Sequence, residues 1–143
     1  MTTTKRILGM LTVACLALST LACGAVGNAA ARQKTTNDIK QVLLSYLSFI
    51  DDKKGPPADE KAFAAWVAAK QPEAAPAWTN LQAGGYKVYW GVNPMKLTAG
   101  SSNTVLVYPG DAPTNGGVVG FADGSVRVVT AAEFNAAAKP PAK

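Results

Sequence analysis

Few residue types in this chain are suited to catalysis. It contains no histidine, which excludes the serine–histidine and cysteine–histidine pairs that activate a nucleophile, and no zinc ligand set can be assembled from its cysteines alone. Asp51 and Asp52 are the clearest adjacent carboxylates, and paired carboxylates can act as general acid and base. Lys53 and Lys54 follow them directly, a pattern typical of a solvated charge cluster. We therefore predict that the protein is not an enzyme.

A second set of polar residues could bind calcium, which takes several oxygen ligands from a loop. The candidates are Asp111, Asn115 and Asp123, together with Thr114. Their spacing matches no calcium motif, and Asp, Asn and Gly are common in turns for reasons of backbone geometry. We favour turn formation at these positions, and we expect no cofactor.

Four aromatic residues could form a stacking surface for a glycan or a partner peptide: Tyr86, Tyr89, Trp90 and Tyr108. Strands recruit aromatic residues for packing in any case, so we favour a role in the core. Tyr89 lies on the opposite face from Tyr86 and Trp90, and it is the residue that we expect to be exposed.

The N-terminal segment has the order of a secretory signal, with Lys5 and Arg6, an apolar run and then small residues. The run is shorter than the roughly 20 apolar residues of a membrane-spanning helix. We predict a signal peptide over residues 1–22 and export of the protein. Removal of Lys5 and Arg6 from the 14 basic residues leaves 12 against 9 acidic residues, so the net charge falls from +5 to +3. The remaining lysines are scattered, so we expect no nucleic-acid partner.

The two cysteines indicate a covalent modification. Cys15 lies inside the apolar run, and Cys23 closes it in the sequence Leu-Ala-Cys-Gly. A lone cysteine in an exported chain cannot form an internal disulfide. The segment resembles bacterial lipoprotein signals, in which a small residue precedes the cysteine that receives lipid. The alternative is ordinary cleavage in the Ala/Gly stretch up to Ala31, by which Cys23 would be lost.

The lipoprotein resemblance implies where the protein lies. Acyl chains such as palmitate on Cys23 would supply enough apolar area to hold the protein on a bilayer. Gly24 after the cysteine does not resemble an inner-membrane retention signal. We therefore expect a lipoprotein anchored in the outer membrane, facing the periplasm or the surface.

Two helices are predicted in the mature chain, after a tether over residues 23–34. The first starts at Thr35 or Thr36 and ends near Lys54, with Gly55 in the left-handed position and Pro56 preventing continuation. We do not expect the apolar N-terminal stretch to run on into this helix. Its buried face recurs at three- and four-residue intervals: Ile39, Val42, Leu43, Tyr46, Leu47 and Ile50.

The second helix is predicted from Asp59 to about Lys70, with Phe63, Trp66 and Val67 on its apolar side. The stretch from Pro72 to Gly85 is interpreted as a connection. Beyond it the apolar period changes to two, which predicts strands over residues 86–90 and 104–108, followed by a loop over residues 111–117.

The sequence GGVVGFADGSVRVVTAAEF, residues 116–134, predicts a hairpin and a short helix. Asp123-Gly124 is the dipeptide preferred in two-residue type I′ turns. That turn gives one apolar face made of Val119, Phe121, Val126 and Val128. The other face would carry Gly120, Ala122, Ser125 and Arg127. Thr130 and Glu133 form a capping box for the helix, which we expect at the edge of the hairpin.

These elements predict an α+β fold, with an N-terminal amphipathic helix and a second short helix packed on a small antiparallel sheet. The C-terminal Asp-Gly hairpin and the terminal helix complete a domain over residues 35–138. Residues 139–143 are expected to be a disordered tail.

Two segments resemble bacterial prepilin-like, or pseudopilin-like, proteins. The sequence NDIKQVLLSYLSFIDDKKGPPADEKAF is similar to their N-terminal helix and proline-containing loop, with matches at Asn37, Ile39, Lys40, Gln41, Tyr46, Gly55 and Pro56. The hairpin is similar to their C-terminal hairpin, with matches at Gly117, Phe121, Asp123, Gly124 and Val126. The resemblance covers about a third of the chain and implies a pilin-like domain with a structural or interaction role.

The sequence departs from that family at two places. Pro113 stands where many relatives have a histidine, ten positions before Asp123. A prepilin leader would place glutamate five residues into the mature chain, but cleavage after Gly9 would place Ala14 there. We infer a pilin-like domain carried on a lipoprotein signal, and we do not expect assembly into a pilus.

The expected function is that of a non-catalytic cell-envelope lipoprotein, with the membrane and envelope proteins as partners. One alternative is a minor pseudopilin of a secretion or pilus system, embedded through an uncut hydrophobic helix. Another is a periplasmic sugar- or calcium-binding module, which would show a ligand-dependent shift in melting temperature.

Overall fold

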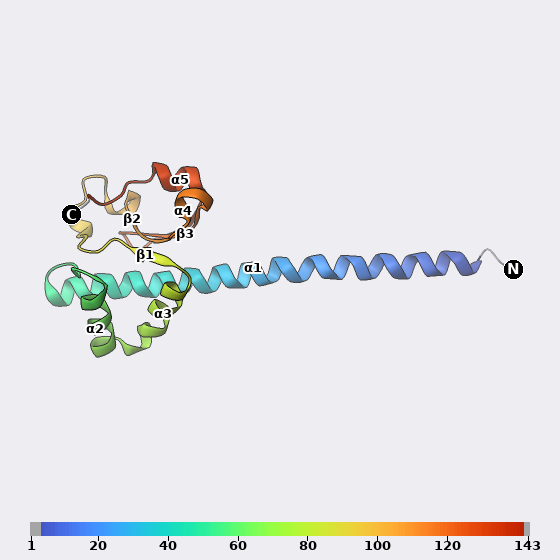
Figure 1. Cartoon of the computed structure of the whole chain (residues 1–143), viewed down its shortest axis with the longest axis horizontal. Helices are drawn as coiled ribbons and strands as arrows, with labels where there is room; N and C mark the ends of the chain where they lie inside the picture. The colour runs from blue at the N-terminus through green and yellow to red at the C-terminus, as the bar shows by residue number, and fades with distance from the viewer. Residues whose placement is uncertain (1–3, 142–143) are drawn as a thin grey trace. The chain divides into compact units, whose positions relative to one another are not determined.

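The computed structural model describes the backbone of residues 4–141 and the side chains of residues 28–141. The chain divides into two units, Met1–Lys34 and Thr35–Lys143. Helix α1 (Thr4–Lys53) contributes residues to both units, and the remaining elements belong to the second (Figure 1). The predicted α+β class is confirmed, because helices in this second unit pack on a four-stranded antiparallel sheet.

Helix α1 begins far before Thr35, so the predicted start of this helix is wrong. Residues 23–34, which we expected to be a tether, are helical, and the apolar stretch does run on into a long helix. The reason is composition: this segment contains no proline and is rich in alanine, the best helix former. Gly24 and Gly27 each cost about 1 kcal/mol relative to alanine, too little to end a helix among such neighbours.

The predicted apolar face of α1 is confirmed over its C-terminal part. Its most deeply buried residues are Ile39, Val42, Leu43 and Tyr46, each at most 1% exposed. The helix ends at Lys53, and Lys54 adopts the left-handed conformation with φ 58°. The prediction that Gly55 takes this conformation is wrong, because the left-handed residue that ends the helix is Lys54, one position earlier. A non-glycine residue pays about 1–2 kcal/mol for it.

Helix α2 (Glu60–Lys70) matches the predicted second helix. The backbone N–H of Ala62 donates to Asp59 Oδ1 at 2.8 Å, which caps the helix. Phe63, Trp66 and Val67 are buried, as their spacing predicted.

The segment from Pro72 to Gly85 is not a plain connection. It forms a 3₁₀ turn, η1 (Pro72–Ala74), and helix α3 (Ala75–Ala83). Both prolines stand in the first turn of their element, where a missing N–H has no helical partner to lose. The prolines therefore start these elements, and α3 buries Trp78 and Leu81.

The sheet has the order β1-β2-β3-β4, with all neighbours antiparallel. Its strands are short: β1 (Tyr86–Val88), β2 (Val105–Pro109), β3 (Gly117–Phe121) and β4 (Val126–Val129). The connection between β1 and β2 holds two 3₁₀ turns, η2 (Pro94–Lys96) and η3 (Ser101–Asn103). The loop predicted before β3 contains a short helix, α4 (Ala112–Asn115).

The predicted register of the hairpin is wrong by one residue. Val118 lies opposite Val128 and Gly120 lies opposite Val126. Asp123 does not take the positive φ that a type I′ turn requires, and only Gly124 does, with φ 87°. The loop therefore has three residues, a common hairpin length when glycine occupies the left-handed position.

This register places apolar residues on both faces of β3. Gly120 faces α1 closely, since a Cβ there would lie 2.7 Å from Ile39 Cγ2. Phe121 points the other way, since neighbouring residues of a strand alternate between faces. Gly120 and Ala122, which we placed on the polar face, are therefore buried, whereas Arg127 is exposed.

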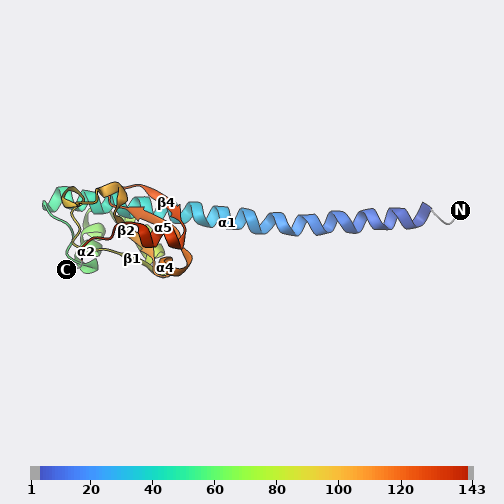
Figure 2. The ribbon, with the colours of Figure 1, turned by 90° about the horizontal axis from the view of Figure 1, so that it is seen from above.

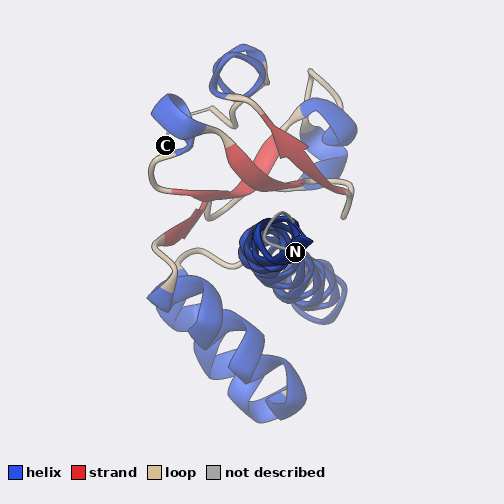
Figure 3. Cartoon of the chain, turned by 90° about the vertical axis from the view of Figure 1, so that its right-hand side faces the viewer, coloured by secondary structure: helices blue, strands red, loops and turns tan. Residues whose placement is uncertain are grey.

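Two groups of helices cover the two faces of the sheet. Helices α4 and α5 (Ala131–Ala136) lie on the side away from α1, and α5 overlies the sheet when it is seen from above (Figures 1 and 2). A view along the chain shows the strands between the α1 layer and the short helices (Figure 3). The predicted capping box of α5 is confirmed, but the helix covers a sheet face and not merely an edge.

We name two buried clusters according to this layering. The α1-side cluster joins α1, α2 and α3 to the sheet and contains Tyr46, Phe49, Phe63, Trp66 and Trp78, among others. The α5-side cluster is smaller, and its buried members are Val105, Ala112, Val119, Phe121 and Phe134.

Candidate functional site

The carboxylate pair at the end of α1 makes a structural contact. Trp66 Nε1 donates to Asp52 Oδ2 at 2.8 Å, and Lys53 Nζ lies 3.4 Å from the same oxygen. The Trp66 hydrogen bond lowers the pKa of Asp52 below its ordinary value. Asp51 and Asp52 are both exposed. Asp52 therefore ties α1 to α2, and both carboxylates lie at the surface.

The calcium candidates are engaged in local turns. Asn115 Nδ2 donates to Asp111 Oδ2 at 2.9 Å across α4. Ser125 donates to Asp123 Oδ1 from its backbone N–H at 2.9 Å and from its hydroxyl at 2.6 Å. Partial burial raises the pKa of Asp123, but these hydrogen bonds outweigh it and the net shift is downward. Within residues 28–141, no three acidic, cysteine or histidine side chains lie close enough together to hold a metal ion.

The aromatic residues pack in the core, as we favoured. Trp90 lies 5.7 Å from Trp78 and 5.5 Å from Phe63, ring centroid to ring centroid. Tyr89 stacks on Tyr108 at 5.0 Å. The prediction that Tyr89 is exposed is wrong: it is half-buried, because the α5-side cluster covers this face of the sheet.

The signal segment 1–22 and the lipidation candidate Cys23 lie outside the residues whose side chains the structure describes. Across residues 28–141, no helix combines the length and the apolar character needed to cross a membrane.

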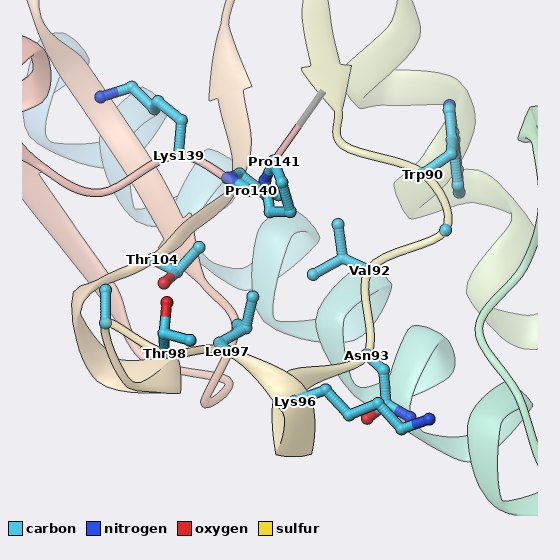
Figure 4. A pocket seen from close by; sticks show the side chains of 12 residues that line it. Trp90, Val92, Asn93, Lys96, Leu97, Thr98, Thr104, Lys139, Pro140 and Pro141 are labelled. Atoms are coloured by element: carbon cyan, nitrogen blue, oxygen red, sulfur yellow. The ribbon is translucent and has the colours of Figure 1, made fainter. Parts of the chain in front are cut away.

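A pocket of about 330 Å³ opens between the connection that follows β1 and the C-terminal segment (Figure 4). Its apolar walls come from Trp90, Val92, Leu97, Pro140 and Pro141. The hydroxyl groups of Thr98 and Thr104 point toward each other on one side.

The C-terminal segment is held at this pocket by backbone bonds. Val105 N donates to Ala138 O at 3.0 Å, and Ala138 N donates to Asn103 O at 3.2 Å. Lys139, which we assigned to a disordered tail, donates from Nζ to the carbonyl oxygens of Phe134 and Ala137. Its ammonium group therefore hydrogen-bonds the carbonyl groups at the end of α5 and points away from the pocket (Figure 4).

A second recess of about 430 Å³ lies along the outer edge of β1. Helices α2 and α3 contribute Glu60, Trp78 and Gln82 to its wall, and the strand side contributes Tyr86, Lys87, Val88, Trp90 and Tyr108. Sequence reasoning missed this recess because one wall belongs to α3, which we interpreted as a connection. The prolines at the first turns of η1 and α3 were the available signal.

No protein-family model, characterised protein or solved structure is detectably similar to this chain.

Proposed function

We propose that the protein is a non-catalytic cell-envelope lipoprotein, anchored by lipid on Cys23, whose α+β domain has a pilin-like structural or interaction role. One observation carries the proposal. Three of the carboxylates considered for chemistry make structural contacts instead, Asp52 with Trp66, Asp111 with Asn115 and Asp123 with Ser125. A domain built in this way presents surfaces for contact.

The pilin-like part of the proposal is supported by the packing of α1. The C-terminal part of this helix lies on an antiparallel sheet, and the contact is close because Gly120 has no side chain. The Asp-Gly hairpin that resembles the family contributes this strand. These features support a pilin-like arrangement without implying assembly.

The lipid anchor is tested by metabolic labelling of the expressed chain with an alkyne analogue of palmitate. We expect label in the membrane fraction and a mature N-terminus at Cys23, measured by intact mass and N-terminal peptide. Cys23→Ser should lose both the label and the processing. Cys15→Ser is the matched control, because this cysteine lies inside the predicted signal, and it should keep both. Equal labelling of Cys23→Ser would refute the anchor.

A minor pseudopilin is the second candidate, and the continuity of α1 favours it. Helix α1 runs unbroken from Thr4 to Lys53, so a retained N-terminus would form one hydrophobic-to-amphipathic helix. The same mass measurement separates the two candidates. A chain beginning at Met10, or one that keeps the whole apolar segment without lipid, would support the pseudopilin and contradict the lipoprotein.

A further inference from the structure

Strand β1 leaves one edge of the sheet open to an incoming strand. It is the terminal strand in the order β1-β2-β3-β4. Tyr89 N donates to Leu106 O at 2.9 Å, and Gly110 N donates to Gly85 O at 3.0 Å. Bonded and non-bonded pairs alternate in an antiparallel ladder. The intervening residues Tyr86 and Val88 therefore direct their backbone N–H and C=O groups away from β2.

The pairing partner of Tyr86 agrees with this assignment. Tyr86 lies opposite Pro109, which has no N–H to donate. Val88, two residues further along β1, lies opposite Val107, and these two residues also form a non-hydrogen-bonded pair. Two residues of β1 thus present unused donors and acceptors spaced as in a β-strand.

The 430 Å³ recess described above lies beside these groups and gives them a groove. Trp78 and Gln82 of α3 face the strand across it, with Glu60 at the start of α2. Such a groove between a strand edge and a helix suits an extended peptide, which adds main-chain hydrogen bonds and places alternate side chains in the groove.

The groove carries one charge of each sign. Glu60 is exposed, and its carboxylate accepts a hydrogen bond from Gln82 Nε2. Lys87 is exposed on the strand side, with its Cε 3.3 Å from where a Cβ on Gly110 would lie. A complementary ligand therefore carries a cationic side chain toward Glu60 and an anionic one toward Lys87.

We propose that this β1 groove binds an extended peptide segment of an envelope partner, which adds to β1 as a further strand of the sheet. The segment has β-forming residues between one basic and one acidic side chain. This inference deepens the proposed interaction role and rests on it. The lipid-labelling test does not depend on the groove, so the two proposals fail separately.

The opposite edge of the sheet serves as an internal comparison. Phe121 N donates to Ser125 O, so Val126 and Val128 of β4 also direct backbone groups outward. There the guanidinium of Arg127 lies 4.0 Å from the centroid of the Phe121 ring. The recess along β4 is lined chiefly by alanines and valines and lacks the tryptophans and tyrosines of the β1 groove.

The test uses the full-length chain in detergent micelles and the blocked pentapeptide acetyl-Lys-Val-Thr-Val-Glu-amide. We expect binding to slow hydrogen exchange at the amides of Tyr86 and Val88 and to change tryptophan fluorescence. A peptide of the same side chains with its alternate backbone nitrogens methylated should not bind, because it cannot form the ladder. This comparison requires no change in the protein.

A pair of variants tests the strand edge itself. Val88→Pro removes an outward N–H while the ladder to β2 keeps its bonds, a position where edge strands tolerate proline. We expect it to weaken peptide binding by roughly 2- to 12-fold, the value of one hydrogen bond. Val88→Ala keeps the N–H and should bind more tightly than Val88→Pro.

Four results would overturn the proposal. They are equal binding of the N-methylated peptide, protection at Val126 and Val128 instead, no binding at millimolar peptide, and binding of cellohexaose in the same groove without any peptide binding. The last result would assign the groove to a glycan.

Discussion

The two faces of the sheet are covered by elements of very different size. On one face, α1, α2 and α3 supply a large cluster in which five aromatic side chains are buried: Tyr46, Phe49, Phe63, Trp66 and Trp78. On the other face, the six-residue helix α5 places Phe134 against Phe121 and three aliphatic residues. The α1-side cluster holds the domain together through three longer helices, whereas the α5-side cluster depends on α5 and the four-residue helix α4.

This difference suggests that the faces differ in stability under local opening. Short elements with few buried contacts open at lower free energy than the core. Helix α5 also fixes the C-terminal segment, whose backbone bonds to Asn103 and Val105 close one pocket. We therefore expect the α5 face to respond locally to mutation and the α1 face to respond globally.

The largest effects should come from removing one phenylalanine on each face. Phe63→Ala should cost about 3–5 kcal/mol of unfolding free energy, because its ring is fully buried among other aromatic rings. Phe134→Ala should cost about 3 kcal/mol, the lower end of that range, since α5 can shift toward the space. Denaturant unfolding followed by far-ultraviolet circular dichroism, which reports the helices and strands of both faces, measures both losses.

Hydrogen exchange distinguishes local opening of the α5 face from global unfolding. All three tryptophans pack in or against the α1-side cluster, so their fluorescence reports that face. Phe134→Ala should speed exchange in α5 and β4 more than in α1. Equal acceleration in α1 would show that the two faces open as one unit, contrary to the comparison.

The next effect tests how closely α1 approaches the sheet. Gly120→Ala would place a Cβ 2.7 Å from Ile39 Cγ2 and 2.9 Å from Leu43 Cδ1, and overpacking of this kind costs about 1–3 kcal/mol. The control is Gly55→Ala, where no atom lies within 4 Å and φ is not left-handed. That change should be neutral or stabilise by up to about 1 kcal/mol. Thermal unfolding that ranks them in the other order would exclude a tight helix–sheet contact.

The contributions of α1 and α2 to the α1 face could be predicted from the sequence, whereas the contribution of α3 and the α5 face could not. The three- and four-residue spacing of Ile39, Val42, Leu43 and Tyr46 defines one helical face wherever the helix begins. The second face depends on hairpin register, and a shift of one residue moves every side chain to the opposite face. Asp123-Gly124 is compatible with a two- or a three-residue loop, and the folded chain adopts the three-residue loop, in which only Gly124 of the pair has a positive φ.

The candidate sites also show that local sequence patterns predict local contacts but not contacts between distant segments. The hydrogen bonds of Asp111 and Asp123 are local, so turn chemistry predicted them. The β1 groove needs side chains from α2, α3 and the strand together, and no local pattern brings these segments side by side.

Alkaline pH should weaken both faces through two tyrosines, Tyr46, which is buried, and Tyr108, which is half-buried. Burial raises the pKa of Tyr46 to about 12, and burial with help from Tyr89 does the same for Tyr108. Their phenols stay protonated in the folded chain while the unfolded chain ionises near pH 10. Their contribution is therefore full below about pH 10 and is lost as the pH rises toward 12. Unfolding midpoints measured between pH 9 and 12 should fall, with each Tyr→Phe variant falling less steeply.

Tyr46→Phe has a second consequence at neutral pH. The Tyr46 hydroxyl accepts from Val92 N and donates to Val92 O, each at 3.0 Å, so the variant leaves two backbone groups without this partner. A loss of about 1–3 kcal/mol is expected. Tyr108→Phe is the counterpart on the other face. A flat pH profile in the wild-type protein would contradict the raised pKa values.

The smallest effect should be confined to α5, and it tests whether this helix behaves as a local unit. Thr130→Ala removes the side-chain half of the capping box, in which Glu133 N donates to Thr130 Oγ1 at 3.2 Å. The other half, from the backbone N–H of residue 130 to Glu133 Oε2 at 2.7 Å, does not need the threonine side chain. Loss of such a cap costs about 1 kcal/mol. Glu133→Gln keeps the capping box, since glutamine serves at this position too, and is the matched control. We expect faster hydrogen exchange in α5 for Thr130→Ala alone, with unchanged tryptophan fluorescence. Faster exchange in α1 as well would mean that this small helix helps to hold the large cluster, and the two faces would then be coupled.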